Sequence, residues 1–320
     1  MTTLDQKISR VRHDCVKKVK KRSRKCLVDG CSELAIGSHV IQRKGALNKI
    51  SESGKLIRPI ADGFKKCIDF KEVGIKKPCT YKILCNKHDQ EIFEYIEKGY
   101  VNFLDDRSLL LLSYRAVLAE IVKLENIVSA TELEVEDKIL RDYVDKGKYD
   151  NHMQKKKIQI SRIFSYKKFL EEDLNSEGSK KFIFLTRIID RIPICASSIF
   201  SDIRGRSREV EKMDGLDVVF LPEVIFNIVP IDDNKSVLTL GFLKKDESHV
   251  SDFLKDFPNG SQEEIEIFIS DILLRSMNYW FSSPKFYEQF IKGRARELSE
   301  QIKEAVSNPV CRISYNLFKV

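Results

Sequence analysis

The sequence lacks any apolar run that is long enough to cross a lipid bilayer. Its most apolar stretches, residues 109–113 and 181–190, are far shorter than the roughly 20 residues that a membrane-spanning helix needs. The first thirty residues are rich in Lys and Arg and contain no apolar core, so we expect no secretory signal peptide. These absences favour the reducing cytoplasm, where disulfides are rare.

Several enzyme signatures are also missing. The sequence has no Gly-rich loop followed by Lys and Ser or Thr, which argues against a nucleotide-binding P-loop. It has no Gly-x-Ser-x-Gly elbow, which argues against a serine hydrolase of the α/β type. It contains no internal repeat and no low-complexity tract. The 320 residues are enough for two or three domains with hydrophobic cores.

Positive charge is concentrated in the N-terminal part of the chain. Residues 1–100 hold 23 Lys and Arg against 12 Asp and Glu, whereas the rest of the chain holds 33 against 36. This asymmetry predicts a polyanionic partner, because neutralising phosphates releases counterions. A solvated basic tail is the simpler alternative, and a membrane partner is not expected, because no apolar face accompanies the charges. The residues expected to contact a nucleic acid, DNA more than RNA, are Lys17, Lys18, Lys20, Lys21, Arg22, Arg24, Arg43 and Lys44.

The pattern of apolar residues divides the chain into three regions and predicts an α+β protein. Residues 1–104 read as a basic, irregular module with short strands near 35–42, 55–60 and 81–84 and a closing helix near 87–98. Residues 105–178 read as helical, with Thr131 as a candidate N-cap. Residues 179–320 contain β-branched and aromatic runs followed by helical patterns. They predict a mostly antiparallel sheet with helices on one side.

Two pairs of residues with metal-ligand spacing stand out among the eight cysteines and five histidines. Cys26 and Cys31 lie in a turn that contains Gly30, as in a zinc knuckle. Cys85 and His88 lie at the start of a helix, where one turn presents both side chains. Two ligands from each segment predict a tetrahedral Cys3His site for a structural Zn²⁺ ion. The order of knuckle, hairpin and helix is that of a treble clef.

Other uses of the cysteines stay open. They could be buried structural residues, which are common in cytoplasmic proteins. Cys67 and Cys79 lie between the two pairs and could replace one ligand. Cys15, Cys195 and Cys311 stand in unrelated contexts and are expected to pack in the core.

Beside the metal ligands, residues 26–97 carry His39 in a strand-like segment and Asp89 directly after His88. This pattern resembles the HNH, or ββα-metal, nucleases in their treble-clef form. The resemblance implies that His39 is the general base that activates water, and that Asp89 holds a Mg²⁺ or Mn²⁺ ion against the scissile phosphate. The residue types suit these roles, because an imidazole accepts protons near neutral pH. A carboxylate oxygen suits such cations.

The chain departs from the family pattern in three places. Ser38 stands where the family usually has Asp, and Asp89 stands where it usually has His. No asparagine occurs in the few residues before Cys85. A core histidine at position 39 and an acid that favours the helix N-terminus at position 89 are therefore the simpler alternatives.

The N-terminal pattern, which includes "AIGSHVIQ" and "CNKHDQEIFEYIE", is also similar to a group of uncharacterised bacterial proteins of about this length. Some of those proteins are associated with defence against phage. The sequence thus predicts a metal-dependent HNH-like endonuclease of the bacterial cytoplasm with a role in antiphage defence. The alternatives are a non-catalytic zinc-containing nucleic-acid-binding protein, and a protein-interaction or sensor protein with structural zinc. In the last case, residues 179–320 would bind a protein partner or a second copy.

Overall fold

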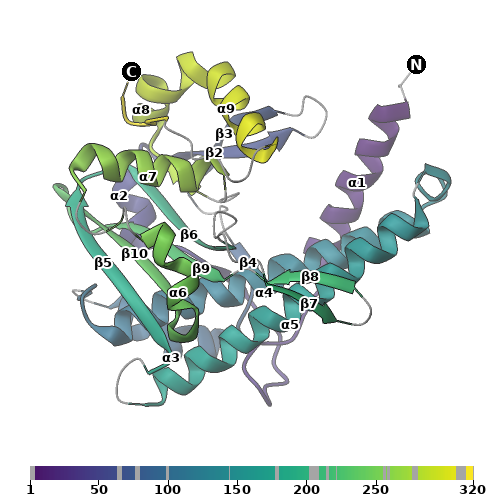
Figure 1. Cartoon of the computed structure of the whole chain (residues 1–320), viewed down its shortest axis with the longest axis horizontal. Helices are drawn as coiled ribbons and strands as arrows, with labels where there is room; N and C mark the ends of the chain where they lie inside the picture. The colour runs from purple at the N-terminus through teal and green to yellow at the C-terminus, as the bar shows by residue number, and fades with distance from the viewer. Residues whose placement is uncertain are drawn as a thin grey trace.

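An antiparallel sheet of seven strands runs through the molecule, and helices cover both of its faces (Figure 1). The computed structural model describes residues 4–62, 67–75, 80–98, 101–143, 145–176, 180–201, 209–213, 216–220, 222–254, 257, 260–275, 280–307 and 315–319. Its combination of helices with an antiparallel sheet confirms the α+β class predicted from the sequence. The helices within residues 244–307 pack on one face of the sheet, and the helices of the middle region cover its other face.

The centre of the sheet consists of strands whose residues are buried on both faces. The strand order is β3 (Cys67–Gly74), β2 (Lys55–Asp62), β11 (Trp280–Ser282), β6 (Ile194–Ser201), β9 (Glu223–Pro230), β10 (Lys235–Leu243) and β5 (Phe182–Asp190). Every residue of β9 is buried. Such continuous β-branched and aromatic runs are typical of strands that are covered on both sides. The last strand, β5, pairs with β10 from Phe182↔Leu243 to Asp190↔Lys235 and forms one edge of the sheet.

Two strands of the N-terminal region belong to this sheet. The hairpin β2–β3 lies in sequence between the two predicted metal-binding segments, yet it pairs with β11, which in turn pairs with β6. The strand β11 is short and completely buried, and its Trp280 packs edge-on against Phe70 of β3. Strand pairing therefore crosses the predicted border between residues 1–104 and 179–320, and the division into three regions stays a prediction.

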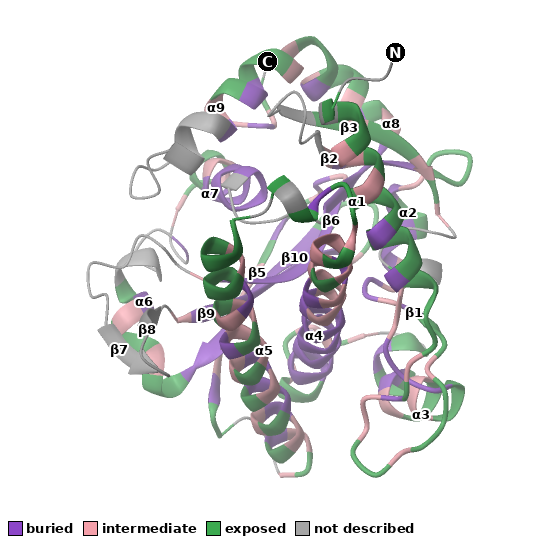
Figure 2. Cartoon of the chain, turned by 90° about the vertical axis from the view of Figure 1, so that its right-hand side faces the viewer, coloured by how far each residue is buried: buried purple, intermediate pink, exposed green. Residues whose placement is uncertain are grey.

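Two long antiparallel helices, α4 (Asp106–Glu136) and α5 (Lys146–Leu174), pack on one face of the sheet. The Asp105 side chain caps α4 by accepting hydrogen bonds from the N–H groups of Arg107 and Ser108. Most residues of α4 are buried, as Figure 2 shows, because the helix lies between the sheet, α5 and the N-terminal segments. The prediction of an N-cap at Thr131 is wrong: the helix continues through it, and its hydroxyl donates to the Ile127 carbonyl.

Residues 4–21 form helix α1 (Leu4–Lys21), where the sequence suggested an irregular arm. Its C-terminal half packs against α4 through the buried residues Cys15 and Val19, and its N-terminal end points away from the body of the molecule (Figure 1). Lys82 caps the C-terminal end of this helix: its ammonium donates to the carbonyls of Lys21 and Arg22 at 3.1 and 2.8 Å. The basic residues of this segment therefore stand on a helix of fixed direction.

The remaining elements cover the second face of the sheet or lie at its margins. The helices α6 (Glu247–Leu254), α7 (Gln262–Arg275) and α9 (Ala295–Ser307) supply apolar residues to the core on that face. The short elements are α2 (Asn48–Ile50), α8 (Pro284–Phe286) and the hairpin of β7 (Glu209–Met213) and β8 (Leu216–Phe220). Among the described helices, none has the length and apolar character that crossing a membrane requires.

The first testable feature is Glu223, whose carboxyl is buried beside Arg162 and accepts a hydrogen bond from Ser201. Burial raises the pKa of this carboxyl above its ordinary value of 4.5. The folded state therefore binds the proton more tightly than the unfolded state does. We expect this group to lower stability as the pH rises from about 4.5 through the raised pKa.

Glu223→Gln should flatten this part of the dependence of the melting temperature on pH. Glu247→Gln, a change at an exposed position of α6, should keep the slope of the unmodified chain. Thermal unfolding between pH 4 and pH 8 measures both. Equal slopes for the Glu223 variant and the unmodified chain would contradict this account.

Candidate metal centre

The first half of the candidate centre is a tight turn that carries Cys26 and Cys31. The N–H of Cys26 donates to the Glu33 carbonyl, and the N–H of Cys31 donates to the Val28 carbonyl. Gly30 has a φ of +77°, a conformation that glycine adopts without steric cost. The turn therefore closes on itself and presents both sulfur atoms on the same side.

The second half is the start of helix α3 (Asn86–Glu97). Cys85 is the extended residue before the helix, and His88 lies in its first turn. A hydrogen bond of 3.1 Å from the Leu27 N–H to the Ile83 carbonyl holds the turn beside the chain that leads into the helix. The two segments are thus joined by backbone contacts immediately next to their Cys and His residues.

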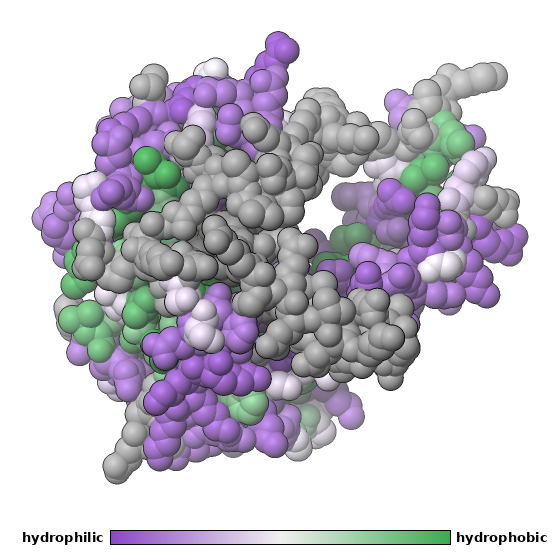
Figure 3. Space-filling model, in the orientation of Figure 1, coloured by the Kyte–Doolittle hydropathy of each residue, from purple (hydrophilic) through white to green (hydrophobic). Residues whose placement is uncertain are grey.

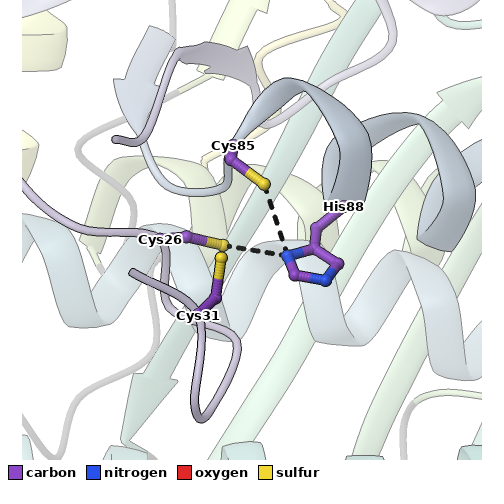
Figure 4. A group of neighbouring side chains, drawn as sticks. All are labelled: Cys26, Cys31, Cys85 and His88. Carbon is purple, nitrogen blue, oxygen red and sulfur yellow. Dashed lines mark hydrogen bonds between the residues drawn. The ribbon is translucent and has the colours of Figure 1, made fainter. Parts of the chain in front are cut away.

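These contacts bring the four predicted ligands together. The ligand atoms of Cys26, Cys31, Cys85 and His88 all lie within 4.8 Å of one another. The Nδ1 atom of His88 lies 3.4 Å from the Cys26 sulfur and 3.3 Å from the Cys85 sulfur (Figure 4). Ligands bound to one tetrahedral zinc ion stand roughly 3.3–3.8 Å apart. The four residues could hold a metal ion, and their donor set is compatible with zinc.

The surroundings of the sulfur atoms differ. Burial raises the pKa of the Cys26 thiol above its ordinary value. The backbone N–H of His88 donates to the Cys85 sulfur and lowers the pKa of that thiol. A metal ion must displace the thiol protons, so metal binding at this centre weakens as the pH falls.

No second group of three or more His, Cys, Asp or Glu side chains has metal-binding proximity within the described part of the chain. The alternative ligands cannot be placed, since the side chain of Cys67 and all of Cys79 lie outside the described residues, as does Cys311. Cys15 and Cys195 are buried away from the cluster, as expected for packing residues.

A buried lysine joins the metal-binding turn to the long helices. Lys167 of α5 contacts the Asp29 carboxylate of the turn at 3.0 Å and the Glu171 carboxylate at 2.8 Å. Glu171 also accepts a hydrogen bond of 2.6 Å from the Tyr114 hydroxyl of α4. Burial raises the pKa of Tyr114, so this phenol stays a neutral donor. The sequence did not reveal this network, because its members lie far apart along the chain.

His39 and Asp89 line one surface hollow of about 700 Å³. The strand β1 (Gly37–His39) ends at His39 and pairs with β4 (Thr80–Lys82), which leads directly into α3. Asp89 follows the metal ligand His88 in α3, and its Oδ1 atom is buried without a donor among the described residues. The lining of the hollow consists of Gly37, Ser38, His39, Gln42, Asp89, Gln90, Glu91, Glu94, Glu97 and Lys98.

The hollow is acidic, and ion pairs fix two of its four carboxylates. Glu94 contacts Lys98, and Glu97 contacts the buried Arg115. Asp89 and Glu91 have no salt-bridge partner among the described residues. The sequence indicated Asp89 but not the three glutamates of the same helix. Glu91, Glu94 and Glu97 follow one another at intervals of three residues along α3. This spacing could have predicted that their side chains lie on the same face of the helix.

The predicted nucleic-acid contacts are only partly gathered in space. Lys20, Arg22 and Arg24 line a second hollow, which shares Gly37 with the first. Lys17, Lys18 and Lys21 are exposed on α1 but line neither hollow. The side chains of Arg43 and Lys44 lie outside the described part of the chain. Arg58 and Lys82, which the sequence did not single out, line the second hollow.

Comparison with protein-family models, with curated proteins and with solved structures found no match to this chain.

The second prediction concerns metal content. The unmodified chain should purify with about one Zn²⁺ per chain, and Cys85→Ser should lose most of it, because a hydroxyl is a far weaker zinc ligand than a thiolate. Cys15→Ser changes a buried thiol outside the cluster and should retain the ion. Elemental analysis of the purified proteins measures the ratio. An unchanged zinc content in Cys85→Ser would contradict the ligand assignment.

The third prediction concerns the lysine beneath the turn. Lys167→Met should destabilise the chain by about 1–3 kcal/mol, because it leaves the Glu171 carboxylate without its buried ammonium partner. It should also speed the transfer of zinc to a chelator, since Asp29 loses its anchor. Lys168→Met, at an exposed neighbouring position, should alter neither quantity. Chemical unfolding and chelator kinetics measure the two effects, and identical behaviour of both variants would contradict the coupling.

Proposed function

We propose that this chain is a metal-dependent, HNH-like endonuclease that hydrolyses phosphodiester bonds in nucleic acid. One observation carries the proposal: His39 and Asp89 line the same hollow, directly beside the Cys/His cluster. The cluster, the strand pair β1–β4 and the helix α3 follow one another in the order that the treble-clef form of these nucleases has. We assign a structural Zn²⁺ ion to Cys26, Cys31, Cys85 and His88.

Each side chain has a distinct task in this proposal. The His39 imidazole takes a proton from the attacking water. The Asp89 carboxylate would hold a Mg²⁺ or Mn²⁺ ion that keeps several of its waters. When bound, this cation neutralises charge on the scissile phosphate and on the leaving oxygen. The zinc centre fixes β1 and the start of α3, so that the two side chains keep their separation.

A second candidate is a zinc-containing nucleic-acid-binding protein without catalysis. It is favoured by the finding that the described residues hold a single group of three or more potential metal ligands, and this group is the Cys/His cluster. In this case the acidic hollow would be a remnant, and the basic residues of the N-terminal region would carry the function.

The role of the sheet is proposed on different grounds. Its edge strand β5 exposes Ile188, with 49 % of the residue accessible to solvent. Figure 3 shows apolar atoms gathered on the side of the molecule where β5 lies. An open strand edge with apolar side chains can pair with another chain. We therefore propose that residues 179–320 bind a protein partner or a second copy. A bacterial cytoplasmic setting and a role in antiphage defence, which the sequence resemblance implies, are further parts of the proposal.

The fourth prediction tests catalysis. In the presence of Mg²⁺ or Mn²⁺, the unmodified chain should cleave DNA, and His39→Ala and Asp89→Ala should each reduce the rate by about 100-fold or more. His152→Ala, at an exposed position of α5, should cleave at the unmodified rate. Plasmid and oligonucleotide substrates of DNA and RNA, incubated side by side, measure the rates and the preference.

Three outcomes separate the candidates. Cleavage that both hollow variants lose supports the endonuclease. Salt-sensitive binding without cleavage by the unmodified, zinc-loaded chain rejects the endonuclease and supports the binding protein. Absence of both binding and cleavage rejects these two candidates and leaves the protein-interaction role.

A further inference from the structure

A second hollow, of about 330 Å³, shares Gly37 with the hollow of His39 and Asp89. It is open to solvent at the C-terminal end of α1, where this helix meets α4 and the strand pair β1–β4. Five segments of the chain line it: the end of α1 with the residues that follow it, β1, β2, β4 and α4. Its lining residues are Val19, Lys20, Arg22, Arg24, Gly37, Arg58, Thr80, Tyr81, Lys82, Val122 and Asn126.

The lining of this hollow contains five cationic side chains and, within the described residues, no acidic one. Two of the cations are fixed: Lys82 donates to the carbonyls that end α1, and Arg24 contacts Glu125 at the margin. The Nε atom of Arg24 is buried and has no acceptor among the described residues. Lys20 and Arg22 are exposed and have no acidic partner in the described part of the chain. Such a site has unmet capacity for an anion.

The chemistry of the lining suits a phosphate group. Guanidinium groups bind phosphate oxygens in pairs, and a lysine adds a mobile point charge. Thr80, Tyr81 and Asn126 add polar groups, whereas Val19 and Val122 give the hollow an apolar wall against which a sugar can pack. The volume is at the lower end of the range for ligand sites, so it suits one backbone unit rather than a folded polymer.

The basic hollow lies next to the hollow that contains the proposed catalytic residues His39 and Asp89. Gly37 lines both hollows, which therefore adjoin at β1. A Cβ atom at position 37 would lie 2.9 Å from the Thr80 side chain, so a larger residue where the hollows meet would have to displace Thr80. A nucleic-acid strand that passes over Gly37 would lie in both hollows at once.

We infer that the basic hollow binds a backbone phosphate of the same nucleic-acid strand that is presented to His39 and Asp89. The part of this inference that concerns cleavage at His39 and Asp89 rests on the proposed function. The binding of an anion in the basic hollow is inferred from the lining residues of that hollow alone. The hollow then sets the register of the strand, and the phosphate that reaches the acidic hollow is the one to be cleaved. Arg58 and Lys82 thereby join the N-terminal basic residues in binding the substrate.

The test compares two double variants that remove the same charge. Lys20→Gln/Arg22→Gln changes the two exposed cations of the hollow, and Lys155→Gln/Lys157→Gln changes two exposed cations of α5. Binding is measured with both double variants in the His39→Ala background, where the probes are not cleaved, and cut positions are measured with the same double variants in the otherwise unmodified chain. The probes are a short fluorescent DNA oligonucleotide, single-stranded and as a duplex, and an RNA of the same sequence. Fluorescence anisotropy at several salt concentrations gives the affinities.

We expect Lys20→Gln/Arg22→Gln to bind the oligonucleotides roughly tenfold more weakly or worse. The slope of log affinity against log salt concentration should become shallower by about one to two, because two phosphate contacts are lost. The α5 variant should match the His39→Ala parent. Because the substituted residues of both double variants are exposed, the two variants and their parent should have equal melting temperatures. Arg58→Gln on β2 removes a different positive charge from the same hollow and should also weaken binding.

The outcomes separate this inference from the proposed function. Weaker binding by the hollow variants, with no cleavage by the unmodified chain, upholds the phosphate site and rejects the endonuclease. Cleavage by the unmodified chain, with equal binding and equal cut positions in Lys20→Gln/Arg22→Gln, rejects the phosphate site and keeps the endonuclease. Absence of affinity for every oligonucleotide at low salt also overturns the inference.

Discussion

The N-terminal part of the fold depends on the meeting of four ligand atoms from two segments that are far apart in sequence. Three sulfur atoms and one imidazole nitrogen lie within 4.8 Å of one another, although a long insertion separates Cys31 from Cys85. Thiolates at this distance repel one another unless a cation lies between them. The turn at residues 26–31 packs Leu27 and Val28 against the buried core that contains Ile83, Leu84 and Phe93. A metal ion bound by the four residues would add its binding free energy to this packing.

The rest of the molecule limits the freedom of this centre. Lys167 and Glu171 of α5, with Tyr114 of α4, hold the metal-binding turn from below. The insertion between β1 and β4 forms the hairpin β2–β3, which the buried strand β11 ties into the seven-stranded sheet. The centre is therefore attached to regular elements on two sides. Such attachment is what a site needs if its side chains are to keep fixed separations.

The sequence predicted the features that arise from local chemistry. The spacing of Cys26, Cys31, Cys85 and His88 indicated the cluster, and apolar periodicity indicated α3 and the strands of the third region. Helix α1 was missed because its lysines and arginines obscure an apolar stripe through Ile8, Cys15 and Val19, whose spacing is helical. The pairing of β2–β3 with β11, and the arginine of β2 in the basic hollow, depend on contacts between distant segments. No local pattern encodes such contacts.

The two hollows that share Gly37 differ in charge, and this difference constrains any function that involves a polyanion. Asp89, Glu91, Glu94 and Glu97 line the hollow of His39, whereas cations line its neighbour. A phosphate enters the basic hollow without further help, but carboxylates repel it from the acidic one unless a divalent cation neutralises them. A strand that lies across both hollows therefore needs a metal ion on one side only. In the proposed endonuclease, anchoring of the strand is then independent of the divalent cation, and the approach of the scissile phosphate to His39 depends on it. The same arrangement without a cation gives a protein that binds the strand and leaves it intact.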